Sequence, residues 1–303
     1  MRSSIFSNTS GIGQLALLIV FTIASVLIFA LIGVAVGYAS TGVSITAGLD
    51  YANLSEADIL YLKILQIFQS FGLFIVPPFL ALVLFGKQSE DYFYFNSSKS
   101  INYLLAGVLM LVAVPFINAT AMWNQQMIWP DFMKGLSDWM TIREEQAAEL
   151  TKHFLKASHI SAMFFNLFIM AVLPAIGEEL MFRGVIQKLM TRISGNLHWG
   201  IWITAFLFSA IHFQFFTFLP RFLMGAAFGY MLIWSKSIWL PIIAHFVNNG
   251  SAIVLNYMVQ NKGMNESMEN IGTEDYGISF IISMLLISGI IFYFYKNRLK
   301  TEV

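Results

Sequence analysis

The stretch Ala175-Ile-Gly-Glu-Glu-Leu-Met-Phe-Arg-Gly184 overlaps the end of an apolar run, residues 160–176, that is hydrophobic enough to lie in a bilayer. Ionisable groups at such depth are costly, and they mark functional sites. On a helix, Glu179 and Arg183 lie four residues apart on one face with the acid first, which favours an ion pair. Glu178 points about a quarter-turn away and has no partner on its own helix. We therefore predict that Glu178 is a general base and that the ion pair supports it.

The composition is that of an integral membrane protein. Of 303 residues, 57% are hydrophobic and 11% are charged, whereas a soluble domain carries about 25% charged residues. The formal net charge is zero, which gives no reason to expect a nucleic-acid partner. The chain has no cysteine, which excludes disulfides, thiolate nucleophiles and cysteine metal ligands. We expect the lipid bilayer to surround the functional site.

Apolar runs of about 20 residues, the length needed to cross a bilayer, recur along the chain. We predict an all-α fold, a polytopic membrane bundle of about eight transmembrane helices around a polar cavity, in one domain covering residues 1–303. The first run exceeds the apolar region of a cleaved signal peptide, which has about 7–15 residues, so we expect it to remain as a helix. The predicted helices cover residues 13–38, 60–85, 101–122, 158–187, 197–214, 217–234, 237–258 and 277–296.

The distribution of positive charge predicts the orientation. Lys and Arg accumulate in cytoplasmic loops, and with both termini inside, the short outer loops hold only Arg221 and Lys262. We therefore expect a protein of the bacterial cell (inner) membrane with both termini in the cytoplasm. The cytoplasmic segments would then hold Arg2, Lys87, Lys99, Lys188, Arg192, Lys236, Lys296, Arg298 and Lys300.

One long outer segment, residues 122–157, has apolar residues at roughly helical spacing, with charged residues between them. This pattern is typical of a helix that lies on the bilayer surface. Such a helix could be a connector that covers apolar surface, or a lip or gate over the active site. The apolar positions are Phe132, Leu136, Trp139, Met140, Ala147, Leu150 and Phe154.

Three further polar residues, His212, His245 and Asn249, lie in apolar surroundings. His245 and Asn249 are four residues apart and share one helical face. Together with Glu178 they come from three predicted helices, and we predict that they form one polar site. Glu178, assisted by His212, can take a proton from a water and return it to a leaving amine. His245 and Asn249 can donate hydrogen bonds to the oxyanion that forms on an attacked carbonyl.

The same side chains could instead bind a metal. Two histidines and a carboxylate are sufficient ligands for a catalytic zinc with one open position, and these would be Glu178, His212 and His245. The chain lacks a His-Glu-x-x-His helix, and the ligands would come from three separate helices. We therefore expect that no cofactor is required, with zinc as the alternative. The Gly-x-Ser-Gly and Gly-x-Gly-Asp motifs of serine and aspartyl intramembrane proteases are absent.

The polar residues fall into three short motifs, Glu178-Glu179-x-x-x-Arg183, Phe208-x-x-x-His212 and His245-x-x-x-Asn249. In order and spacing these resemble the motifs of the CAAX prenyl protease and bacteriocin-processing family, also called Abi. The resemblance covers a motif-bearing core, residues 157–257. It implies an intramembrane endopeptidase, similar to type II CAAX prenyl endopeptidases, that acts on a membrane-associated peptide or protein. It further implies that the first glutamate and the second motif's histidine activate a water, and that the last motif holds the oxyanion.

A second class of function is non-catalytic. An immunity or scaffold protein, or a transporter that uses buried acids as a proton relay, could have the same fold. Transporters usually contain internal repeats with broken helices at matching positions, and the sequence contains no visible repeat. A phenotype that survives the loss of Glu178, His212 and His245 together would favour a scaffold.

Overall fold

A computed structural model describes residues 5–44, 53–85, 92–127, 129–265 and 277–298. The regular elements of this part of the chain are all helices, with no β-strand, which confirms the predicted all-α fold. Seven helical segments in it are long and apolar enough to cross a membrane. They mark an integral membrane protein, and each coincides with one of the predicted helices.

The first three spans are α1 (Gly11–Thr41), then α2 (Glu56–Ser70) with the π-helix η2 (Phe71–Ile75) and α3 (Val76–Phe85), and α5 (Ser100–Gln125). A stretch outside the spans follows, with η3 (Asp131–Met133) and α6 (Lys134–Leu155). The fourth span joins α7 (Ile160–Leu167), η4 (Phe168–Val172), α8 (Leu173–Glu179), η5 (Leu180–Ile186) and α9 (Gln187–Ser194). The chain continues with α10 (Leu197–Ala210), η6 (Phe215–Thr217), α11 (Phe218–Ser235), α12 (Trp239–Lys262) and α13 (Ile278–Lys296).

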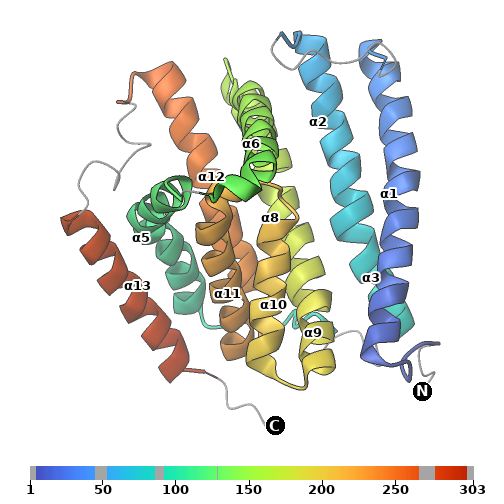
Figure 1. Cartoon of the computed structure of the whole chain (residues 1–303), viewed down its shortest axis with the longest axis vertical. Helices are drawn as coiled ribbons and strands as arrows, with labels where there is room; N and C mark the ends of the chain where they lie inside the picture. Colours follow the sequence, from blue (N-terminus) through green and yellow to red (C-terminus); the bar gives the residue numbers. More distant parts are fainter. Residues whose placement is uncertain (1–4, 45–52, 86–91, 128, 266–276, 299–303) are drawn as a thin grey trace.

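The fifth predicted helix, residues 197–214, is the one that does not match a span, because it is shorter than expected. It ends at Ala210 after 14 residues, and at 1.5 Å per residue it extends about 21 Å, less than the ~30 Å hydrocarbon core. At this end His212 Nδ1 bonds the carbonyl of Phe208, and Phe213 adopts a left-handed φ of 52°. Since α12 continues well beyond the end of α10 (Figure 1), the loop that carries His212 lies inside the depth of the bundle.

The helices are arranged around a central group, α8 to α12 (Figure 1). The pair α1 and α2 lies at one edge, and α13 lies at the opposite edge against α5. α1 begins and α13 ends at the same end of the bundle, as the predicted topology requires (Figure 1). That this end is cytoplasmic stays a prediction. Among the basic residues on which it depends, Arg2, Lys87 and Lys300 lie outside the described residues.

Local sequence signals set several helix ends. Ser10 caps α1, its Oγ accepting from the backbone N–H of Gly13, and the helix stops at Gly42 in the left-handed conformation. Ser55 and Asp58 form a reciprocal capping box at the start of α2. These contacts satisfy backbone groups that the helix ends would otherwise leave unpaired. The spans therefore begin and end at defined residues.

π-Helical turns interrupt two of the spans, and two of these turns end two residues before a proline. η2 is followed by Pro77-Pro78, and η4 is followed by Pro174. A proline lacks the N–H of the usual helical bond and its ring crowds the preceding turn, so a wider turn accommodates it. A third π-turn, η5, begins directly after Glu179. Wide turns therefore flank both sides of the short helix α8, which carries both glutamates.

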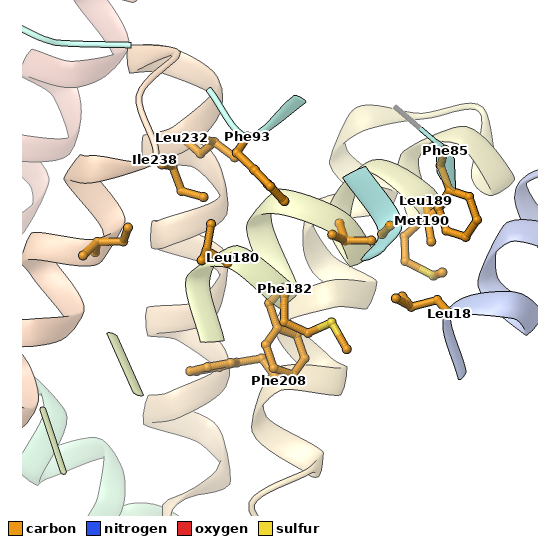
Figure 2. Close-up of a cluster of buried hydrophobic side chains, with 14 of the residues drawn as sticks. Leu18, Phe85, Phe93, Leu180, Phe182, Leu189, Met190, Phe208, Leu232 and Ile238 are labelled. Atoms are coloured by element: carbon orange, nitrogen blue, oxygen red, sulfur yellow. The ribbon is translucent and has the colours of Figure 1, made fainter. Parts of the chain in front are cut away.

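An apolar cluster joins α8 and the following η5 to α10 (Figure 2). Leu180 and Phe182 of η5 and Phe208 of α10 are each 2% exposed. The rings of Phe182 and Phe208 meet edge to face with their centroids 5.2 Å apart. Phe208 is also the first residue of the second motif. The core therefore holds α10 against the glutamate helix and fixes the position from which His212 emerges.

Candidate active site

Two histidine side chains, from the loop after α10 and from α12, converge on Glu178. Its Oε2 atom lies 3.8 Å from Nε2 of His212 and 3.9 Å from Nε2 of His245. These distances exceed those of direct hydrogen bonds, and polar groups at such a spacing are commonly bridged by water. The same Oε2 is buried and has no hydrogen-bond partner among the described residues. The structure thus brings three predicted site residues together at a spacing that suits a bridging water.

The hydrogen-bond partners of the Nδ1 atoms of His212 and His245 define which nitrogen of each neutral ring carries the proton. His212 Nδ1 lies 2.7 Å from the carbonyl oxygen of Phe208, which can only accept, so Nδ1 carries the proton. His245 Nδ1 lies 2.8 Å from Oε1 of Glu179, which is an acceptor when ionised. In the neutral rings both Nε2 atoms are therefore unprotonated. The Nε2 atom of a neutral His212 thus faces Glu178 as an acceptor, as is needed to hold a water.

Glu179 and Arg183 form the ion pair predicted from their spacing. Nη1 lies 2.9 Å from Oε1, and both side chains are 0% exposed. Arg183 Nη2 also donates to the carbonyl of Gly225 at 3.1 Å, and the guanidinium lies 4.4 Å from the centroid of the Phe208 ring. Because one oxygen of Glu179 accepts from both Arg183 and His245, the ion pair is connected directly to the third motif.

Asn249 lies one helical turn beyond His245 on α12 and lines the same cavity. Its Nδ2 donates to the carbonyl of Met170 in η4 at 3.2 Å, and its Oδ1 accepts from Nδ2 of Asn248 at 3.0 Å. A side-chain amide nitrogen carries two N–H groups. One N–H of Asn249 is therefore engaged in positioning, and the other is available to a ligand in the cavity.

These residues line a cavity of about 460 Å³. Its polar wall consists of Asn118, Thr151, Glu178, His212, Gln214, Thr217, Arg221, His245, Asn248 and Asn249. The motifs did not identify Gln214, Arg221 or Asn248. A signal for Arg221 was present, because a cation inside an apolar segment at membrane depth is itself a mark of function. Gln214 and Asn248 had no such signal.

Helix α6 forms one side of this cavity through Thr151 and Leu155. It is attached to the loop after α10, where Oε2 of Glu144 accepts from the backbone N–H of Phe216 at 3.3 Å. Trp139 packs against the ring of Phe215, with centroids 5.6 Å apart. Of the two interpretations of this amphipathic segment, the contacts favour a lip over the site.

The three converging side chains are chemically suitable zinc ligands, but their spacing is wide for this ion. Zinc bonds of about 2.0–2.1 Å in a tetrahedral site place neighbouring ligand atoms about 3.3 Å apart. Glu178 Oε2 lies 3.8 and 3.9 Å from the Nε2 atoms of His212 and His245. Among the described residues, no group of three His, Cys, Asp or Glu side chains is arranged to hold a metal ion. That hydrolysis requires no metal stays a prediction.

Fold and site together define a polytopic helical membrane protein with a buried carboxylate and two imidazoles facing one internal cavity. Residues 160–251, which include all three motifs, match the family described as Type II CAAX prenyl endopeptidase Rce1-like. The match confirms the resemblance drawn from the motifs.

One curated relative is the uncharacterized protein YpbD of Bacillus subtilis (strain 168), which is 29% identical over 86 residues. The aligned part is 27% of this chain and 41% of the relative. The chain therefore spans about two fifths of the length of the curated relative it matches. No solved structure matches the chain.

Proposed function

We propose that this protein is a CAAX protease-like intramembrane endopeptidase that hydrolyses a peptide bond in a membrane-associated peptide or protein. The convergence of Glu178, His212 and His245 on one internal cavity carries the proposal. The family match over residues 160–251 supports a CAAX-protease-like membrane enzyme at the level of the family. The substrate reaches the cavity from the bilayer or from its surface.

In the first step, a water binds between Glu178 Oε2 and His212 Nε2. Both atoms are acceptors, so they take the two hydrogens of the water and direct an oxygen lone pair at the carbonyl carbon of the substrate. The water oxygen forms a bond to this carbon, and its proton passes to Glu178. The carbonyl oxygen becomes an oxyanion.

Asn249 and His245 stabilise this oxyanion by hydrogen bonding, with Asn249 donating through its free N–H. Because His245 Nδ1 donates to Glu179, its Nε2 can donate only from an imidazolium, so in this mechanism His245 carries both ring protons throughout and takes no part in binding the water. The carbon–nitrogen bond then breaks, and the proton on Glu178 passes to the leaving amine. The products are a carboxylic acid and an amine, and Glu178 is again a carboxylate.

A comparison of cells with wild-type and variant protein can distinguish a peptidase from a non-catalytic scaffold. We expect membrane peptides that are present in cells with the wild-type protein to be missing in cells with a Glu178→Gln, His212→Ala, His245→Ala variant. Quantitative mass spectrometry of membrane peptides measures this, with the variant's abundance and unfolding temperature checked against wild type. An unchanged peptide set together with an unchanged phenotype would assign the protein to the non-catalytic class.

We also propose that hydrolysis requires no metal, because Glu178 and His212 are spaced to activate the water themselves. The activity of the purified protein is expected to remain unchanged after dialysis against a chelator, and added zinc is expected not to increase it. A steady-state peptide assay before and after dialysis measures this. If chelation abolishes hydrolysis and stoichiometric zinc restores it, Glu178, His212 and His245 are metal ligands instead.

A further inference from the structure

Arg221 is a cation in the wall of the active-site cavity, in the first turn of α11. Its Nη2 donates to Oε1 of Gln214 at 2.6 Å and to Oγ1 of Thr217 at 3.2 Å. Its Nη1 donates to the backbone carbonyl of Gln214 at 3.5 Å. All of these acceptors are neutral. None of the ion pairs within the described residues includes Arg221.

Arg221 differs in this respect from Arg183, whose charge is neutralised by Glu179 at 2.9 Å. The acids Glu178 and Glu144 act on Arg221 electrostatically but do not bond it. A guanidinium has five N–H groups, and three of them are used in the bonds to Gln214 and Thr217. A cation at membrane depth is costly unless it serves a ligand or a pathway. Arg221 therefore retains charge and hydrogen-bonding capacity for a ligand in the cavity.

Hydrogen bonds from two other helices, α5 and α10, hold the segment that leads into Arg221. Asn124 of α5 donates from Nδ2 to the carbonyl of Phe215 at 3.0 Å, and its Oδ1 accepts from the backbone N–H of Leu219 at 2.8 Å. Ser209 Oγ donates to the carbonyl of Phe218 at 2.7 Å. The backbone that carries Arg221 is thus held in one conformation. A ligand therefore binds a guanidinium whose attachment point is already in place.

The position of Arg221 along α11 separates it from the reacting atoms. Phe228 stacks on the imidazole of His245, with ring centroids 5.7 Å apart, and Arg221 precedes Phe228 by seven residues on the same helix. At 1.5 Å per residue this corresponds to about 10 Å along the axis. Arg221 is therefore attached two helical turns from the residue that packs on His245, a position that suits a substrate group other than the reacting carbonyl.

We propose that Arg221, together with Gln214 and Thr217, binds a carboxylate of the substrate. A planar guanidinium matches a carboxylate in geometry and charge, and such pairs are strong where water is excluded. The inference rests on the proposed peptidase function, because the carboxylate belongs to the peptide that is cut. It comes either from the C-terminus of the peptide or from an aspartate or glutamate side chain.

Binding of defined peptides to the Glu178→Gln protein in detergent micelles tests the proposal without turnover. The probes are three fluorescent apolar decapeptides: one with a free C-terminal carboxylate, its C-terminal amide, and the amide with one internal glutamate. We expect a carboxylate-bearing peptide to bind about tenfold more tightly than the plain amide in anisotropy titrations. The peptide that gains affinity identifies the source of the carboxylate.

Adding Arg221→Gln to this protein is expected to remove the preference, and Arg221→Lys, which keeps the charge without the planar fork, to reduce it. The matched control is Arg143→Gln, which removes an exposed arginine on α6 and is expected to keep the preference. Equal binding of all three peptides, no binding of any, or a preference that persists in Arg221→Gln would overturn the proposal.

Hydrolysis of the same peptides by the wild-type protein separates this inference from the proposed function. A carboxylate preference without hydrolysis would remove the peptidase assignment and keep a carboxylate-binding cavity. Hydrolysis without a carboxylate preference would keep the peptidase and remove the role of Arg221.

Discussion

Replacing Glu178 with glutamine is expected to lower the rate of peptide hydrolysis roughly 10³-fold, within the range of a lost general base. Glutamine keeps the shape of the side chain but cannot accept a proton from water and return it to the amine. Glu178 Oε2 has no hydrogen-bond partner among the described residues, so the change breaks no internal contact there. We expect an unfolding temperature close to that of wild type. Initial rates on a membrane-inserted peptide and thermal unfolding in the same detergent measure the two effects.

The matched control for this change is Glu145→Gln on α6. It makes the same chemical change at an exposed position, and we expect the full rate. A Glu178→Gln protein that keeps most of its activity would exclude Glu178 as the base. A Glu178→Gln protein that is inactive but also unfolded would say nothing of catalysis, which is why the unfolding temperature is measured alongside the rate.

The parts of the site that could be predicted from the sequence are those that depend on a single helix. The spacing of four residues between Glu179 and Arg183 was sufficient to predict their ion pair. The hydrogen bond from His245 to Glu179 could not be predicted, because it joins residues 66 positions apart and depends on how α8 and α12 are rotated relative to each other. Packing fixes that rotation, and no local pattern records it.

Because local patterns do not record contacts between side chains and backbone, hydropathy predicted one more spanning helix than the structure has in its described residues. Hydropathy located seven spans because each is a continuous apolar run. It extended the predicted helix 197–214 too far, since Ile211 and Phe213 are as apolar as the residues before them. The helix ends where the side chain of His212 bonds the carbonyl of Phe208, a contact to which hydropathy is insensitive. The catalytic histidine candidate is thus placed by the feature that the prediction missed.

The buried pair of Glu179 and Arg183 should have a large effect on stability when either partner is changed alone. Glu179→Gln leaves an arginine with 0% exposure without a counter-ion, and Arg183→Met leaves the carboxylate without its cation. Each change is expected to cost about 3–5 kcal/mol in the free energy of unfolding. Because the double variant contains neither unpaired charge, its cost should be less than the sum of the two. Chemical unfolding in a fixed detergent measures the four proteins of this cycle.

Activity in the same four proteins should follow a different pattern. In the proposed mechanism Glu179 orients the His245 ring and balances the charge of its imidazolium, so Glu179→Gln is expected to lower kcat roughly 10²–10⁴-fold with little change in KM. Arg183→Met keeps the bond between Glu179 and His245 and should retain more activity, although it is unstable. The double variant should therefore regain stability but not kcat. If kcat of the double variant recovers together with its stability, Glu179 acts only by neutralising Arg183. His245 would then stabilise the oxyanion without a carboxylate partner.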